Sequence, residues 1–143
     1  MKIKILKLDE RAKLPTLGST SAAGADIYAL EGFTVAPAET VLAKTGLAAE
    51  IPEGYVGLMC ARSGIALKKG LAPANKVGIV DSDYRGELMV AIHNHSLTEQ
   101  TIEAGERMAQ LVIVPYLRAE YELVDSLSDT ERGTGGFGST GKM

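Results

Sequence analysis

Residues 78–89 read GIVDSDYRGELM, which is the pattern of two short strands joined by a turn. Apolar residues lie on both sides of a segment with two aspartates and a glycine, which are residues that favour turns. One interpretation is a hairpin with solvated aspartates. The other is a functional site, in which one aspartate acts as a general base toward water and Tyr84 forms a flat wall for a ring.

Short runs of strand length continue on both sides of this stretch, separated by 16 glycines and 5 prolines. In residues 2–5 lysine alternates with isoleucine, which places the two residue types on opposite faces of a strand. The spacing predicts an all-β fold, a sandwich or jelly roll. One short helical turn is predicted from Ser63 to Gly70. The strand-length runs are 2–8, 40–43, 46–51, 55–60, 77–80, 87–94, 110–115 and 120–124.

Length and composition describe one ordinary domain. The 143 residues, 45% hydrophobic and 23% charged, exclude a disordered, collagenous or coiled-coil chain. A net charge of −3 gives no general reason to bind nucleic acid. The longest apolar stretch, 111–117, is far shorter than the roughly 20 residues of a membrane span. The single Cys60 excludes an internal disulfide, and with no signal-peptide pattern at residues 1–13 we expect a cytoplasmic protein.

The C-terminal segment 132–141 reads RGTGGFGSTG, with five glycines. It matches G-x-G-x-x-G and the start of a phosphate-binding loop, but both motifs require a strand before and a helix after, so we exclude them. Such a segment is too flexible to fold alone, and a disordered tail is one interpretation. An arm that orders over a nucleotide is the other, because Arg132 and the hydroxyls suit phosphates and Phe137 suits a base.

Three further features suggest an anionic ligand. The tetrapeptide ARSG at 61–64 places an arginine at the start of the predicted helical turn, which suits a phosphate. Asp26 is either a turn residue or a group that holds hydrated Mg²⁺. Gln110 is a polar residue that leads into an apolar run. His93 and His95 would share a face of a strand, but two ligands do not make a metal site, and surface histidines are the preferred interpretation.

Taken in order, five motifs resemble the pattern of the trimeric dUTP diphosphatases (dUTPases). They are AGADI at 23–27, ARSG at 61–64, GIVDSDYRG at 78–86, GERMAQL at 105–111 and RGTGGFGSTG at 132–141. The resemblance runs from about Ile3 to the last residues. It departs from the family at Ala25 and Ala61, neither of which carries the chemistry.

The resemblance implies a jelly-roll β-sandwich that forms a homotrimer with active sites at the subunit interfaces. The implied reaction converts dUTP and water to dUMP and pyrophosphate with Mg²⁺, which removes dUTP and supplies dUMP for thymidylate synthesis. Residues 1–125 would form the core. Residues 126–143 would form a flexible, glycine-rich arm that closes over a neighbouring subunit's site.

The resemblance also implies roles for residues around the nucleoside. Asp81 would be the general base that orients and deprotonates the attacking water. Tyr84 would stack beneath the sugar and exclude a 2′-OH. Asn75 would read the uracil edge together with the backbone at Ile79 and Val80. Met89 would line the same pocket.

The resemblance implies that Arg62, Ser63 and Gly64 bind the phosphates of the leaving pyrophosphate. It also implies that Arg62 and Ser63 are catalytic residues together with Asp81. Gln110 would contact the phosphate tail, and Asp26 would touch Mg²⁺ through water. From the arm, Arg132 would hold the γ-phosphate and Phe137 would stack on uracil. Further phosphate contacts would come from Gly138, Ser139 and Thr140.

Two alternatives remain at the level of sequence. A dCTP deaminase has the same fold, but such relatives carry different residues beside the arginine of the second motif. A non-catalytic, regulatory dUTPase-like protein would carry inserted segments, for which this chain has no room.

Overall fold

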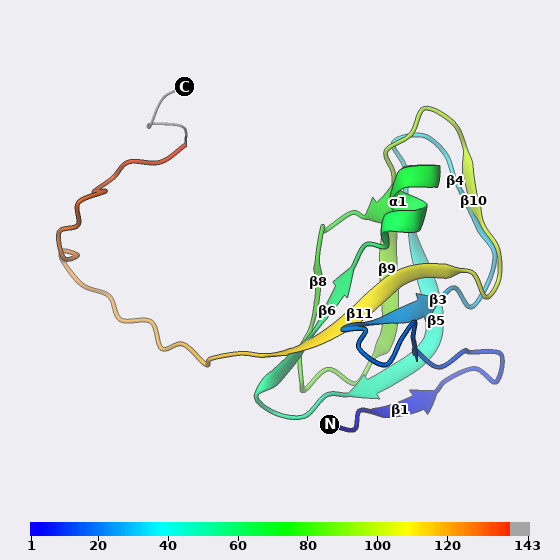
Figure 1. Cartoon of the computed structure of the whole chain (residues 1–143), viewed down its shortest axis with the longest axis horizontal. Helices are drawn as coiled ribbons and strands as arrows, with labels where there is room; N and C mark the ends of the chain where they lie inside the picture. The colour runs from blue at the N-terminus through cyan, green and yellow to red at the C-terminus, as the bar shows by residue number, and fades with distance from the viewer. Residues whose placement is uncertain (138–143) are drawn as a thin grey trace.

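A computed structural model describes residues 1–137 of the chain. Its body is a β-sandwich of antiparallel strands with the one short helix α1 of this described part, Ser63–Lys69. One sheet has four strands in the order β1 (Lys4–Lys7), β5 (Thr40–Glu50), β9 (Glu87–Asn94) and β7 (Leu71–Pro73). The other has five, in the order β2 (Thr16–Leu17), β3 (Gly24–Tyr28), β11 (Arg107–Pro115), β6 (Tyr55–Cys60) and β8 (Gly78–Val80). A two-stranded sheet pairs β4 (Phe33–Val35) with β10 (Gln100–Ile102). The predicted all-β jelly-roll sandwich is therefore confirmed (Figure 1).

The core lies between the two large sheets and follows from the alternation of their strands. In β9 every second residue is buried, and Leu88, Val90 and Ile92 face inward. Met59 of β6 and Leu111 of β11 belong to the same buried cluster. Among residues 1–137 the buried core contains aliphatic and Met side chains and no fully buried aromatic ring, so its packing depends on many small and medium-sized side chains.

Two predicted runs, 40–43 and 46–51, form one strand instead of two. Gly46 has a φ of 69°, which a glycine adopts without strain, and the register of β5 against β9 shifts between Lys44 and Ala48. The glycine therefore makes a bulge within β5 and does not end the strand. Nearby, the buried Thr45 hydroxyl donates to the Leu88 carbonyl at 2.6 Å, which secures the bulge to β9.

The chain leaves the sandwich after β11. The prediction of a strand at 120–124 is wrong: no strand forms among described residues 116–137, because this segment runs away from the body and meets no partner strand (Figure 1). The predicted helical turn is confirmed as α1, which ends at Gly70 with a φ of 64°. Within residues 1–137, no helix has the length and apolar character that a bilayer crossing requires.

Candidate active site

A pocket of about 270 Å³ gathers the residues predicted to surround a nucleoside. It opens between the end of β8 and the start of β9. Asn75, Ile79, Val80, Asp81, Tyr84 and Met89, all six of the residues predicted there, line it. The stretch 78–89 thus forms one wall of a single concave site.

The segment 81–86 passes from one large sheet to the other. β8 pairs with β6 in the five-stranded sheet, whereas β9 pairs with β5 and β7 in the four-stranded sheet. The strand-turn-strand prediction is correct, but the two strands do not form a hairpin with each other. A connection that bridges two sheets leaves a hollow at their edge, and the pocket lies there.

Tyr84 is held against this connection by its hydroxyl, which donates to the Glu87 carbonyl at 2.9 Å. The Tyr84 ring folds back over Gly86, where an added Cβ would lie 2.6 Å from the ring atom Cζ. In turn, a carboxylate oxygen of Glu87 accepts from the Gly46 backbone N–H in the β5 bulge, at 2.8 Å. The exposed ring of Tyr84 therefore has one fixed orientation at the pocket wall.

Asp81 is exposed, and within residues 1–137 its carboxylate takes part in none of the salt bridges or side-chain hydrogen bonds. Its backbone carbonyl accepts from the Tyr84 N–H at 3.2 Å, which closes the turn. Asn75, which also lines the pocket, lies in a tight loop with Lys76 at a φ of 66°. Asp81 is thus positioned by its backbone, with its carboxylate oxygens free to accept a hydrogen bond from water.

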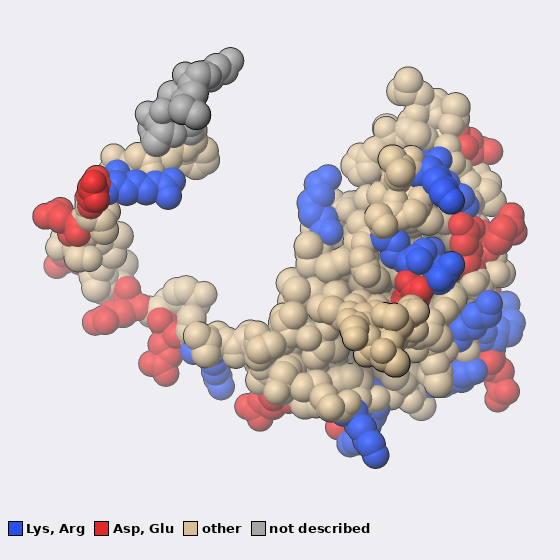
Figure 2. All heavy atoms as spheres, in the orientation of Figure 1, with Lys and Arg blue, Asp and Glu red and all other residues tan. Residues whose placement is uncertain are grey.

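A second group of predicted residues lies around the start of α1, on the outer face of the five-stranded sheet. Arg62 precedes the helix, and its Nε lies 2.6 Å from a carboxylate oxygen of Asp26. The other carboxylate oxygen accepts from Nη1 of Arg107 at 3.2 Å. Basic side chains lie around a small acidic patch over β3 and β11 in Figure 2, the region of these ion pairs.

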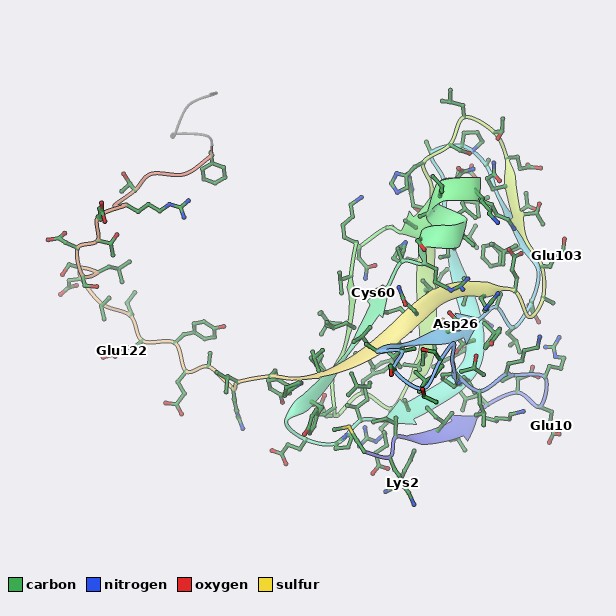
Figure 3. All side chains as sticks on the ribbon, in the orientation of Figure 1. Lys2, Glu10, Asp26, Cys60, Glu103 and Glu122 are labelled. Carbon is green, nitrogen blue, oxygen red and sulfur yellow. The ribbon has the colours of Figure 1, made fainter. Side chains whose placement is uncertain are left out.

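Gln110 joins this group through the strand register. It lies opposite Asp26 on β3 and opposite Cys60 on β6, which Figure 3 shows on the two sides of β11. The Gln110 amide donates to the Ala61 carbonyl at 2.8 Å, which ties the start of α1 to the sheet. An added Cβ on Gly24 would lie 3.1 Å from the Gln110 Cδ, so a larger residue at position 24 would require the Gln110 side chain to shift.

The other end of α1 is anchored by an ion pair. Lys69 lies 2.6 Å from Glu106 and also donates to the Thr101 carbonyl at 2.7 Å. Burial raises the pKa of the Glu106 carboxyl, but hydrogen bonds from Lys69 and from the Glu103 backbone N–H outweigh it and lower the pKa below its ordinary value. The helix that carries Ser63 and Gly64 is therefore fixed at both ends.

Within one chain, the residues that line the pocket and the predicted phosphate-binding residues around the start of α1 do not form one site. Of the predicted phosphate-binding residues, Arg62, Ser63, Gly64 and Gln110 do not line the nucleoside pocket. From the predicted arm, Arg132 and Phe137 lie on the segment that leads away from the body, and Arg132 Nε donates to the Gly135 carbonyl of the same segment at 2.7 Å. Figure 3 labels Glu122 on this segment. The remaining predicted arm residues, Gly138, Ser139 and Thr140, lie outside the described residues.

Several pocket-lining residues and one arginine were not among the site residues predicted from the sequence. Leu42 of β5 and Met59 of β6 line the nucleoside pocket, and Arg107 binds Asp26. Arg107 is 81 residues from Asp26 along the chain, so no local spacing pairs them. Arg107 does lie within the GERMAQL motif, where a charge before a buried strand is the one signal that could have drawn attention to it.

Asp26 does not fit the role of a direct metal ligand. Both of its carboxylate oxygens already face guanidinium groups, and two cations beside the carboxylate disfavour a third. In residues 1–137, no three His, Cys, Asp or Glu side chains come together as a metal site. His93 and His95 pack edge to face with ring centroids 4.5 Å apart, and His93 also contacts the Thr40 hydroxyl.

Comparison with known proteins points to one family. The sequence pattern of the dUTPase family matches residues 10–141. A deoxyuridine 5′-triphosphate nucleotidohydrolase of Nautilia profundicola is 49% identical over 142 residues, covering 99% of this chain and 100% of the relative. The protein of the same name from Hydrogenobaculum sp. is 48% identical, with 99% of both chains covered.

Solved structures agree with the sequence relatives. The dUTPase of Staphylococcus bacteriophage 80alpha, solved with dUPNHPP, superimposes with a TM-score of 0.91 at 34% identity over 99% of both chains. A mutant dUTPase of phage phi11 of S. aureus, described with a structural Mg(II) ion, superimposes with a TM-score of 0.82 at 30% identity, over 88% of this chain and 98% of that one.

Proposed function

Because this chain belongs to the dUTPase family, we propose that Asp81 is the general base of its reaction and that each active site is shared between copies of the chain. The chain is a dUTP diphosphatase, and it hydrolyses dUTP to dUMP and pyrophosphate. The observation that carries the residue assignments is the single pocket lined by Asn75, Ile79, Val80, Asp81, Tyr84 and Met89.

The pocket binds the uracil and the deoxyribose. Asn75 and the backbone at Ile79 and Val80 hydrogen-bond the uracil edge, and a cytosine in their place would leave these groups unpaired, which is a strong ground for rejection. Tyr84 lies beneath the sugar. Its fixed ring, held by the Glu87 carbonyl, leaves no room for a 2′-OH.

Asp81 orients one water toward the α-phosphorus and accepts its proton. The proposal is supported by the exposed Asp81 carboxylate, which no described cation neutralises, and by its place at the pocket wall. Water attack at phosphorus forms the new P–O bond of dUMP, and the bond to the bridging oxygen breaks to release pyrophosphate. Phosphoryl transfer depends mainly on positioning and charge stabilisation, so the remaining residues act on the phosphates.

These phosphate contacts come from a second copy of the chain. Arg62, Ser63, Gly64 and Gln110 lie on the outer face of one sheet, away from the pocket of their own chain. In a homotrimer they face the pocket of a neighbour. Exposed apolar side chains beside the pocket, such as Leu42 and Ile79, support this assembly because association would bury them.

The arm, residues 126–143, completes the site from another subunit. Arg132 binds the γ-phosphate, Phe137 stacks on uracil, and Gly138, Ser139 and Thr140 add phosphate contacts. The segment beyond β11 supports this role because it extends away from the body, as an arm that reaches a neighbour must do (Figure 1). Closure over the substrate excludes water other than the attacking one.

We also propose Mg²⁺ as the cofactor, which the triphosphate of the substrate would hold and which would neutralise charge on the phosphate oxygens. Asp26 would reach it only through water. The phage phi11 relative with a structural Mg(II) ion supports a metal in this family. We place the enzyme in the cytoplasm, in keeping with the free Cys60 thiol.

The test is pyrophosphate release from dUTP, dTTP, dCTP and UTP, each with Mg²⁺. Release from dUTP alone is the expected result. Release from all four would contradict the assignments of Asn75 and Tyr84. Ammonia release from dCTP would indicate a deaminase. No release from an assembled, full-length protein would indicate a regulatory, non-catalytic protein.

A further inference from the structure

The Asp26 carboxylate lies between two guanidinium groups. Arg62 Nε is 2.6 Å from one oxygen, and Arg107 Nη1 donates to the other at 3.2 Å. The side chain of Asp26 is 12% exposed and that of Arg62 is 22% exposed, whereas that of Arg107 is 55% exposed. One negative charge thus joins two positive charges, so the cluster keeps an excess positive charge on the outer face of the five-stranded sheet.

Arg62 is held at a second point. Its Nη1 donates to the backbone carbonyl of Arg107 at 3.4 Å. Within residues 1–137, the hydrogen bonds and ion pairs of the guanidinium involve Nε and Nη1, and Nη2 has no partner. The planar group is therefore fixed in direction, and a donor is left for an anion. A guanidinium fixed in this way loses less freedom when it binds a phosphate than a mobile one does.

The strand geometry explains how Arg107 reaches Asp26. Arg107 pairs with Tyr28 on β3, and the register then shifts before Ala109 pairs with Ile27. Such an irregularity re-aims a side chain. Tyr28 and Asp26 are two residues apart on one strand and point to the same face. The Arg107 side chain therefore extends along β3 by one two-residue repeat, from its partner Tyr28 to the Asp26 carboxylate.

We propose that Asp26 and Arg107 are positioning residues, which together orient the Arg62 guanidinium toward the pyrophosphate portion of the substrate. This inference rests on the proposed function, since it concerns the phosphate half of the same site. Asp26 acts through Arg62, and it does so with or without a metal ion. Arg107 binds the Asp26 carboxylate oxygen that Arg62 does not contact, and it adds positive charge to the cluster.

The proposal differs in its consequences from a role of Asp26 toward Mg²⁺ alone. If Asp26 orients Arg62, its loss weakens the binding of an anion even when no metal is present. If Asp26 acts only on metal-bound water, its loss has no effect until Mg²⁺ is added. Metal-free anion binding therefore separates the two roles.

The experiment measures the binding of inorganic pyrophosphate to the full-length protein by calorimetry, first with EDTA and then with Mg²⁺. The variants are Asp26→Asn, Arg107→Gln and Arg107→Lys. A matched control is Arg11→Gln, because Arg11 is an exposed arginine that bridges two carboxylates, Asp9 and Glu31. Deoxyuridine binding, which needs no phosphate contact, reports whether the nucleoside pocket stays folded.

We expect Asp26→Asn to weaken metal-free pyrophosphate binding by about 10- to 100-fold, the scale on which a misplaced contact acts. Arg107→Gln should weaken it less, Arg107→Lys should restore part of the loss, and Arg11→Gln should match the wild type. Deoxyuridine binding should stay unchanged in all four variants. If Asp26→Asn does not fold, the two Arg107 variants decide the question.

Two results would overturn the inference. One is wild-type pyrophosphate binding by Asp26→Asn and Arg107→Gln in EDTA, with a defect that emerges only with Mg²⁺. The other is a wild-type protein that binds no pyrophosphate without metal. Failure of the proposed function is a separate result, since it is read from the release of pyrophosphate from dUTP by the wild-type enzyme.

Discussion

The Tyr84 ring lies so close over Gly86 that a single added methyl group could not fit between them. A Cβ at Gly86 would lie 2.6 Å from Cζ of the ring, well inside van der Waals contact. The Tyr84 hydroxyl meanwhile donates to the Glu87 carbonyl, so the ring cannot move away without losing this hydrogen bond. The orientation of the proposed sugar platform therefore depends on a residue with no side chain.

We expect Gly86→Ala to displace the Tyr84 ring and to lower discrimination against a 2′-OH. The ratio of kcat/KM for dUTP to that for UTP should fall by about 10- to 100-fold, because sub-ångström positioning is lost. Steady-state pyrophosphate release with both nucleotides measures the ratio. Gly18→Ala is the matched control, since a Cβ there meets no atom within 4 Å. An unchanged ratio in Gly86→Ala would remove Tyr84 from sugar selection.

Asp81→Asn should abolish turnover and leave nucleotide binding nearly intact. The amide cannot accept the proton of the attacking water, and loss of a general base costs about 10²- to 10⁴-fold in rate. Single-turnover kinetics and equilibrium binding of a non-hydrolysable dUTP analogue separate the two effects. Asp83→Asn, two residues away and also exposed, serves as the control. An equal loss of binding and turnover would argue against the role of Asp81 as a base.

Mixing two inactive variants tests the sharing of the site. Arg62→Gln leaves the residues of the proposed nucleoside pocket unchanged, and Asp81→Asn leaves the proposed phosphate-binding residues unchanged. Co-expressed at equal amounts, the two should recover about a quarter of wild-type activity, because one of four random pairings unites both intact halves. Recovery is measured as pyrophosphate release per chain. Mixed assemblies that stay inactive would show that each chain uses its own Arg62.

Removal of residues 132–143 should leave an assembled, folded protein with little activity. The deleted residues lie beyond the last strand, which ends at Pro115, so the sandwich keeps its core contacts. We expect kcat/KM to fall by at least about 100-fold, because the closure that completes the site is lost. Light scattering checks the assembly, and thermal unfolding checks the core. Near-normal turnover would contradict the arm proposal.

The Lys69–Glu106 ion pair should stabilise the protein at neutral pH and lose its effect in acid. Because the folded-state pKa of Glu106 is lowered, its contribution is present above the ordinary glutamate value of 4.5 and is lost as the pH falls through the folded-state pKa. Glu106→Gln should therefore lower the free energy of unfolding by about 1 kcal/mol at pH 7.

Denaturant unfolding at neutral and acidic pH measures this difference, which should shrink in acid. The control is Glu50→Gln, because the Lys4–Glu50 pair is far more exposed, with side-chain exposures of 78% and 47% against 28% for both partners of the Lys69–Glu106 pair. We expect little change in the control. A pH-independent effect of Glu106→Gln would indicate packing and not charge.

Local patterns predicted the elements well where alternation and turn residues agree. The bounds 55–60 and 87–94 match β6 and β9, because the apolar residues that alternate there also face the core. The sequence could not reveal that β8 and β9 belong to different sheets, since a turn of aspartates and glycine is compatible with either pairing. The run 120–124 has strand-forming residues, but it has no neighbouring strand among residues 1–137.

The site was predicted mostly through its motifs, and the missing parts are long-range contacts. Asp26 meets Arg107 across β3 and β11, and Leu42 reaches the pocket from β5. No periodicity in the sequence encodes which strands become neighbours, so these partners emerge only from the folded sheets. The same reason explains why the sequence indicates a turn residue or a Mg²⁺ group at Asp26 and does not indicate its arginine partners.

The separation of Arg62 from the nucleoside pocket of its own chain has a genetic consequence. If the phosphate-binding residues at each pocket come from a neighbouring chain, a defective chain also inactivates the site formed with the pocket of a normal chain. Consider a substitution that disables both the nucleoside pocket and the phosphate-binding residues of one chain. A cell that expresses this variant and the normal chain in equal amounts would then lose more than half of its dUTPase activity. Such a chain would lower the activity of its normal partners although it folds and assembles normally.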